Sequence, residues 1–205
     1  MIWQNLYPLI VKNVPMCEDC PRKANGKQYI YAGAMNMPAI EGEHPWVDVL
    51  FVFDRAQNHR SVIIKWFHEL MREREPGLSY AIIGPTLCPC HDEDGHFTLP
   101  TDEHVRSCQP SLQKVFELVL PKAIAYCGPK AWTRAEFAFY VNDVKIPEIK
   151  LPHPARVIFS EDPIERCRHQ DNYEEALAML RRLVNSSEFS EIIDEMRAIR
   201  EKAGS

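Results

Sequence analysis

Four segments of strand length alternate along the chain with longer stretches whose apolar residues recur at helical spacing. Three of them, residues 47–53, 80–83 and 122–127, are largely apolar, and the fourth, residues 146–151, mixes apolar and polar residues. Apolar runs without polar alternation are typical of parallel strands that are buried on both faces. Because strands alternate with helices, the pattern predicts an α/β fold in which a parallel sheet has helices on both faces.

Helical periodicity and capping signals predict the elements between and after these strands. Ser61 is expected to cap a helix whose apolar side chains share one face. Thr101 is expected to open a helix over residues 102–120, which Pro110 kinks or splits and Pro121 ends. Further helices are expected over residues 130–139, 173–184 and 190–202, and the N-terminal residues 1–13 are expected to form a short helix or an extended arm.

Length and composition favour a single α/β domain. The chain has 205 residues, of which 45% are hydrophobic, and we assign residues 1–185 to the domain and residues 186–205 to a C-terminal helical extension. No segment approaches the roughly 18 apolar residues of a membrane helix, and the N-terminus does not resemble a signal peptide. We therefore expect a cytoplasmic, intracellular protein with no membrane partner, and a monomer is favoured.

The formal net charge of −5 argues against a uniformly basic surface for nucleic acid. It leaves room for a local basic face, because several arginines lie in the last third of the chain. These are Arg156, Arg166, Arg168, Arg181 and Arg182.

Seven cysteines in an intracellular protein favour metal binding or catalysis over disulfides. Cys17 and Cys20 form a C-x-x-C pair, a spacing that lets two thiolates bind one metal ion or one face of a cluster. A redox-active pair would need a preceding strand and a following helix, which this segment does not supply. Cys88 or Cys90, in the loop after the second strand, and Cys108, in the following helix, complete a four-thiolate set.

Asp54 directly follows the first predicted strand. Ligands of open α/β sheets bind beyond the carboxyl ends of the strands, so this position suits a catalytic side chain. The alternative is a solvated carboxylate or a cap for a following helix.

The order of these motifs resembles the iron-sulfur uracil-DNA glycosylases, families 4 and 5 of that superfamily. The resemblance covers about residues 15–185. It includes the C-x-x-C pair, FVFD ending at Asp54, YAIIGPTLC ending at Cys88, a proline and a cysteine at 100 and 108, PKAIAYCG at 121–128, and His-Pro-Ala at 153–155. It implies a three-layer α/β/α sandwich with a four-stranded parallel sheet, a structural [4Fe-4S] cluster and DNA as the partner.

The resemblance also implies roles for individual residues. Cys17, Cys20 and Cys108 match cluster ligands, and either Cys88 or Cys90 is the remaining one. Asp54 would position or activate the attacking water, and His153 would stabilise the negative charge on the departing base. Candidate contacts to DNA or substrate are Arg55, Gln57, His59, Gly84, Pro154 and Arg156.

Two departures change the expected specificity. The stretch after Asp54 lacks the family's glycines and its base-stacking phenylalanine, and Gly84 stands near the position of the asparagine that recognises uracil. We therefore expect a DNA glycosylase that excises uracil or a modified pyrimidine. The alternatives are a non-catalytic DNA-binding relative that retains the cluster, a different enzyme that modifies bases or nucleotides, and a structural zinc protein.

Overall fold

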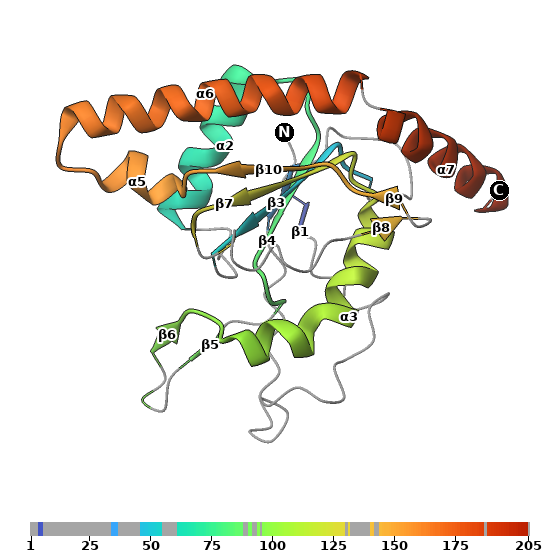
Figure 1. Cartoon of the computed structure of the whole chain (residues 1–205), viewed down its shortest axis with the longest axis horizontal. Helices are drawn as coiled ribbons and strands as arrows, with labels where there is room; N and C mark the ends of the chain where they lie inside the picture. The colour runs from blue at the N-terminus through green and yellow to red at the C-terminus, as the bar shows by residue number, and fades with distance from the viewer. Residues whose placement is uncertain are drawn as a thin grey trace.

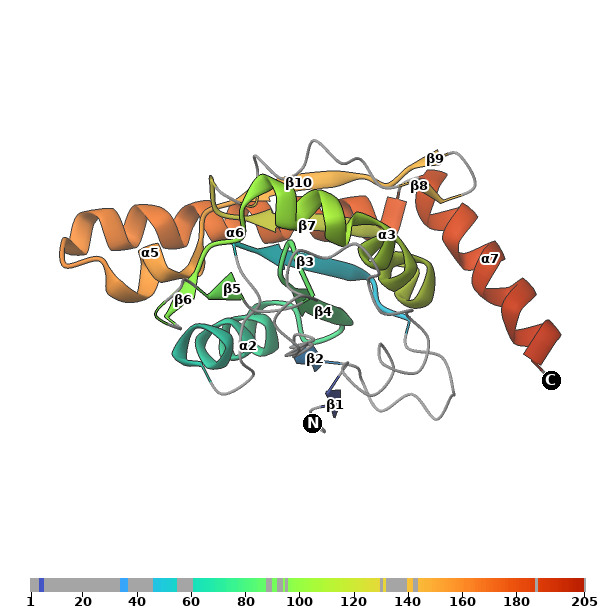
Figure 2. The same cartoon turned by 90° about the horizontal axis from the view of Figure 1, so that it is seen from below.

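The computed structural model describes residues 4–5, 34–36, 46–54, 61–87, 90–91, 94, 96–129, 131, 140–141, 144–186 and 188–204. The four predicted strands form the parallel centre of its sheet. In spatial order these strands are β4 (Tyr80–Ile83), β3 (Val49–Phe53), β7 (Ala123–Cys127) and β10 (Glu148–Leu151). Parallel pairing joins each to its neighbour, and Figure 2 shows the strands side by side in this order.

Two short strands that the sequence analysis did not predict extend the sheet beyond β4. They are β1 (Gln4–Asn5) and β2 (Ala34–Asn36), and both pair antiparallel, so the whole sheet has six strands in the order β1-β2-β4-β3-β7-β10. Segments of two or three residues leave no apolar period to detect. Two further antiparallel pairs stand apart from this sheet: β5 (Cys90–His91) with β6 (Phe97–Thr98), and β8 (Tyr140–Val141) with β9 (Val144–Lys145).

Two predicted helices are confirmed with their caps. Helix α2 (Val62–Arg74) begins where the Ser61 hydroxyl accepts a hydrogen bond from the Ile64 backbone N–H at 3.2 Å. Helix α3 (Asp102–Val119) begins at Thr101, in a capping box completed by His104. Pro110 lies inside α3, which remains one helix; Figure 1 shows its axis changing direction along its length.

The C-terminal helices begin earlier than predicted or were not predicted. Helix α5 (Pro154–Phe159) follows His153 and was not predicted. Helix α6 (Pro163–Ser186) begins ten residues before the predicted start, because Asp162 Oδ1 accepts a hydrogen bond from the Ile164 N–H at 2.8 Å and Pro163 suits a first helical turn. Helix α7 (Glu188–Gly204) covers the predicted 190–202. The predicted helix over 130–139 falls largely outside the described residues.

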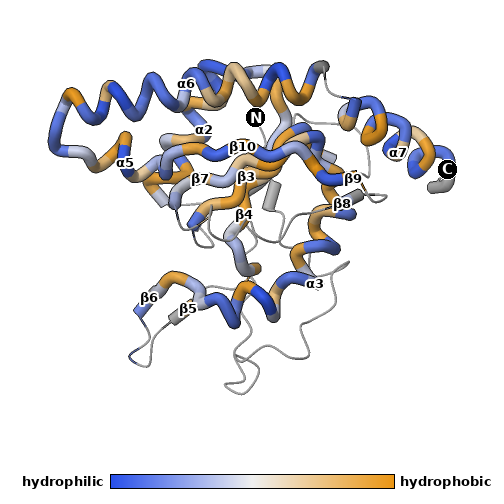
Figure 3. The backbone as a smooth tube through the Cα atoms, in the orientation of Figure 1, coloured by the Kyte–Doolittle hydropathy of each residue, from blue (hydrophilic) through white to orange (hydrophobic). Residues whose placement is uncertain are grey.

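Two apolar clusters, one on each face of the sheet, give the fold its three layers. One joins Leu50 and Val52 of β3 to α3 and to Phe189 and Ile193 of α7. The other joins Val49, Phe51 and Phe53 of the same strand to α2, α5 and α6. Figure 3 shows apolar residues concentrated on the central strands, with polar residues along much of α6. The α/β sandwich with a four-stranded parallel centre is thus confirmed.

None of the helices in the described ranges is long and apolar enough to cross a membrane.

Candidate functional site at the carboxyl edge of the sheet

Three residues from three different strands meet at the carboxyl edge of the sheet. Asp54 follows β3, Gly128 follows β7 and His153 comes two residues after β10. A Cβ atom added to Gly128 would lie 2.8 and 2.9 Å from the two carboxylate oxygens of Asp54 and 2.9 Å from Cβ of His153. With a φ of +105°, this position requires glycine both for its backbone conformation and for its close contacts. The structure therefore brings both predicted catalytic residues together.

Asp54, Gly128 and His153 meet where successive strand connections change from one side of β3 to the other. From β3 the chain passes through α2 to β4 on one side, and then through α3 to β7 on the other side of β3. Such a switch point between neighbouring parallel strands is where open α/β sheets bind ligands. Asp54 and Gly128 are the residues that follow the two strands at this point.

The Asp54 side chain is half-buried and held by a backbone donor. Its Oδ1 accepts a hydrogen bond from the Ala131 N–H at 2.7 Å. Within the described part of the chain, Oδ2 has no hydrogen-bond partner and faces Gly128. The carboxylate is thus oriented through one oxygen, an arrangement that fits either a positioned catalytic group or a cap.

The His153 ring has a defined orientation. Its Nδ1 accepts a hydrogen bond from the Ala155 N–H at 3.1 Å, which caps helix α5. The ring also packs edge-on against Phe53, with the two centroids 5.8 Å apart. Because Nδ1 is an acceptor, the proton of the neutral imidazole is on Nε2. In this tautomer the other ring nitrogen, Nε2, is the N–H donor.

A buried tyrosine supports the segment that contains His153. Tyr173 of α6 donates from its hydroxyl to the carbonyl oxygen of Pro152 at 2.7 Å. Burial, together with the nearby Cys127 thiol, raises the pKa of Tyr173 well above its usual value, so the phenol remains a donor. Burial also raises the pKa of Cys127. This supporting role could not be predicted from the sequence, because an apolar helix position does not identify such a long-range partner.

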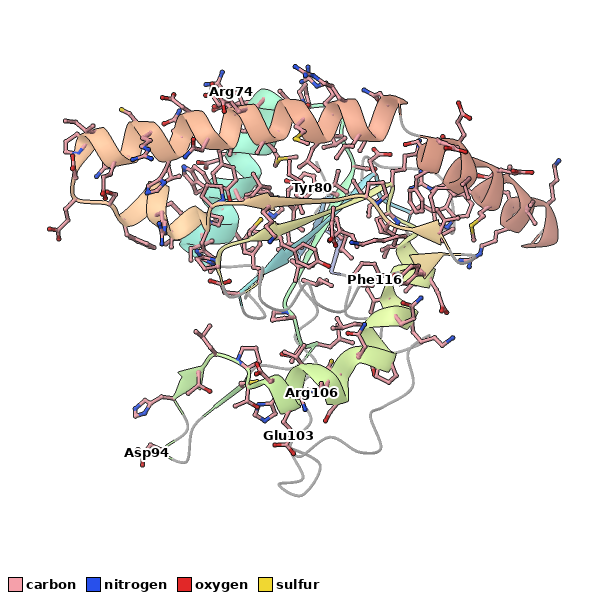
Figure 4. The ribbon with its side chains drawn as sticks, viewed as in Figure 1. Arg74, Tyr80, Asp94, Glu103, Arg106 and Phe116 are labelled. Carbon is pink, nitrogen blue, oxygen red and sulfur yellow. The ribbon has the colours of Figure 1, made fainter. Side chains whose placement is uncertain are left out.

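A small cavity of about 20 Å³ lies on the α3 face of the same edge. Gly84, one of the predicted substrate contacts, lines it and follows β4 directly. Most of the other lining groups are apolar; the lining comprises Val52, Ile83, Pro85, Val105, Gln109, Leu112, Phe116 and Tyr126. Figure 4 shows Phe116 between α3 and the sheet, whereas Glu103 and Arg106 lie on the side of α3 away from it.

Two candidate cluster ligands are described, and both are buried. Cys108 of α3 accepts a hydrogen bond at its Sγ from the Leu87 N–H at 3.3 Å, and Cys90 belongs to β5. Leu87 immediately precedes Cys88 in the sequence. Cys17, Cys20 and Cys88 lie outside the described residues. Within the described ranges there is no group of three side chains suited to a metal ion.

Of the other predicted contacts to DNA or substrate, Arg156 is exposed on α5 and Pro154 is buried at the first turn of that helix. Arg55, Gln57 and His59 lie outside the described residues.

Neither the comparison with protein-family models nor the comparison with curated proteins found a match for this chain.

Proposed function

We propose that this protein is a DNA glycosylase that releases uracil or a modified pyrimidine by hydrolysis of the N-glycosidic bond. The main support is the meeting of Asp54 and His153 across Gly128 at the switch point of the sheet. An acid and an imidazole donor from distant parts of the sequence share one edge, in the order expected from the resemblance.

The chemistry follows from the charges that form when the bond breaks. Electrons of the N-glycosidic bond move onto the base, and positive character develops on the sugar. The Asp54 carboxylate, oriented by the Ala131 N–H, stabilises that positive character or positions the water that attacks the sugar. The Nε2 proton of His153 is directed to the base oxygen that gains negative charge. Water supplies the hydroxyl group to the sugar and a proton to the released base.

A [4Fe-4S] cluster is part of this proposal and has a structural role in it. The buried Cys90 and the Cys108 Sγ that accepts a backbone N–H suit a cluster, because such hydrogen bonds stabilise thiolate sulfur. Cys17, Cys20 and Cys108 would hold it together with Cys88 or Cys90. The cluster would fasten the N-terminal segment to the β4–α3 unit.

Iron and acid-labile sulfide content tests the cluster directly. Cys108→Ala should lose both iron and the brown colour of the purified protein, whereas Cys167→Ala, which changes an exposed thiol on α6, should retain them. A colourless wild-type protein that contains zinc would contradict the cluster.

The enzymatic proposal is tested by measuring abasic sites. Protein kept from oxygen is incubated with oligonucleotides that contain uracil, 5-hydroxymethyluracil or another modified pyrimidine, and strand breakage by alkali is measured. His153→Asn is the matched variant, because asparagine also caps helices well and should preserve α5 while it removes the imidazole. Breakage by the wild type that this variant loses would support a glycosylase.

The Asp54–Ala131 hydrogen bond also favours a second candidate, a non-catalytic DNA-binding relative in which Asp54 is a structural cap. In that case the wild type would bind DNA without releasing any base.

A further inference from the structure

The cavity beside α3 contains a buried hydrogen-bond acceptor. The side-chain oxygen of Gln109 is buried there and has no hydrogen-bond partner within the part of the chain that the structure describes. A buried acceptor without a partner costs about 1–3 kcal/mol, so native proteins rarely retain one without a reason. Gln113, one turn later on the same helix, instead donates to Glu117 Oε1 and to the Tyr140 carbonyl.

Some residues that line the cavity are close in sequence to the residues of the candidate site. Val52 and Tyr126 line it, and they stand two residues before Asp54 and Gly128 on the two central strands. Gly84 lines it at the end of β4 and contributes no side chain. A ligand held between Asp54 and His153 therefore has this cavity next to it, on the α3 side of the sheet.

We propose that Gln109 is a specificity-determining residue that accepts a hydrogen bond from a neutral exocyclic donor on the bound pyrimidine. This inference rests on the proposed function and narrows its substrates to pyrimidines that carry such a donor, which uracil lacks. An exocyclic group on the base edge opposite the sugar projects far enough to enter a narrow cavity. An amino group on the ring and a hydroxymethyl substituent are the simplest groups of this kind.

The lining of the cavity selects a neutral group over a charged one. Apart from Gln109 and the Tyr126 hydroxyl, the side chains around it are apolar. Burial, with the nearby Glu148 charge, raises the pKa of Tyr126, so this phenol stays neutral. Transfer of an ammonium group into such surroundings is strongly unfavourable. A hydroxyl or an aromatic amine costs less to desolvate than an ammonium group, and a hydrogen bond to the Gln109 oxygen offsets that cost.

The test compares bases with and without the donor in one sequence. Single-stranded oligonucleotides in a purine context contain cytosine, 5-hydroxymethyluracil, uracil or thymine at one position. Dissociation constants and base release are measured for the wild type, Gln109→Leu and Gln113→Leu. The wild type should bind at least one of the two donor-containing bases about tenfold more tightly than uracil and thymine. Gln109→Leu should remove this preference, and Gln113→Leu should retain it.

The outcomes separate this inference from the proposed function. Cytosine and 5-hydroxymethyluracil distinguish a ring amine from a substituent as the donor. A Gln109-dependent binding preference without base release would support the inference and contradict the glycosylase. Base release with no dependence on Gln109 would overturn the inference alone. Equal binding of all four bases by the wild type would also overturn it.

Discussion

Two aspartates at opposite ends of β3 illustrate different uses of the same side chain. Asp48 precedes the strand, and its Oδ2 accepts from both the backbone N–H and the hydroxyl of Ser79, at 3.0 and 2.7 Å. Asp54 follows the strand, and within the described residues it accepts one hydrogen bond, from Ala131, and touches Gly128. One carboxylate joins two strands, and the other presents an oxygen at an edge where ligands bind.

The surroundings extend this contrast to the whole sheet. At the amino end, Arg197 of α7 donates to the carbonyls of Val47 and Leu120 at 2.7 and 2.8 Å, and Lys122 forms an ion pair with Asp194. Polar groups there join one part of the chain to another. At the carboxyl end, the glycine at positive φ and the buried Gln109 oxygen lie beside a cavity. The ion pairs and hydrogen bonds at the amino edge thus join distant segments, whereas the carboxyl edge carries the proposed chemistry.

The largest effect is expected from Asp54→Asn. Asparagine keeps an oxygen that can accept from Ala131, so the variant should melt close to the wild-type temperature while it loses the charge. The rate of base release should fall by about 10²- to 10⁴-fold. Single-turnover assays and thermal melts would measure the two effects. Asp48→Asn, the matched change at the other end, should preserve the rate. Asp54 would instead be a structural cap if Asp54→Asn has a much lower melting temperature than the wild type and its base release falls only by the fraction of protein that is unfolded.

Gly128→Ala should disturb both folding and the site. The positive φ costs about 1–3 kcal/mol for a residue with a side chain, and the new methyl group would push Asp54 and His153 apart. We expect a lower melting temperature and a loss of most base release. Gly77→Ala is the control, because a Cβ there has no atom within 4 Å. Equal behaviour of the two variants would show that the contact across Gly128 is not needed.

Asp48→Ala should reduce stability and spare chemistry. It leaves the Ser79 N–H and hydroxyl without their acceptor, at a cost of about 1–3 kcal/mol in the free energy of unfolding. Urea unfolding would measure this loss, and base release per folded molecule should be unchanged. Asp194→Ala removes a largely exposed ion-pair partner and should cost less than about 1 kcal/mol. A large loss of base release in Asp48→Ala would contradict the assignment of the proposed chemistry to the carboxyl edge alone.

The central strands could be predicted from sequence because their signal is local. Largely apolar runs identified β3, β4 and β7, and a segment that mixes apolar and polar residues identified β10, each to within about two residues. The early start of α6 was also visible in principle, since an aspartate followed by proline at positions 162 and 163 is a helix-start signal. Strands β1 and β2 were not predictable, because segments of two or three residues show no apolar period. They are recognised as strands only through their antiparallel pairing.

The site was predictable only in part. The rule that ligands bind beyond the carboxyl ends of strands identified Asp54, and motif order added His153. The contacts of Gly128 and the hydrogen bond from Tyr173 to Pro152 join residues far apart in sequence. No pattern within a single segment specifies such contacts. They become visible only once the strands are placed side by side.

Apart from the controls, the smallest loss of stability is expected from Tyr173→Phe, which removes the hydrogen bond from Tyr173 to the Pro152 carbonyl next to His153. The loss should be about 1 kcal/mol of stability with a modest fall in base release. Burial raises the pKa of Tyr173, so the unfolded chain ionises first as the pH rises past 10.0. Wild-type stability should therefore begin to fall above about pH 9, where Cys127 of the unfolded chain ionises, and fall more steeply above about pH 10, where Tyr173 does.

Tyr173→Phe should weaken this dependence without abolishing it, because Cys127, whose pKa burial also raises, remains in the variant. Urea unfolding at about pH 8 and about pH 11 would measure how steeply the free energy of unfolding falls with pH. Tyr140→Phe, a change at an exposed tyrosine, is the control and should leave it unchanged. A slope in Tyr173→Phe equal to that of the wild type would mean that the phenol ionises as readily in the folded protein as in the unfolded chain. Tyr173 could then not be the buried, permanent donor that holds the His153 segment.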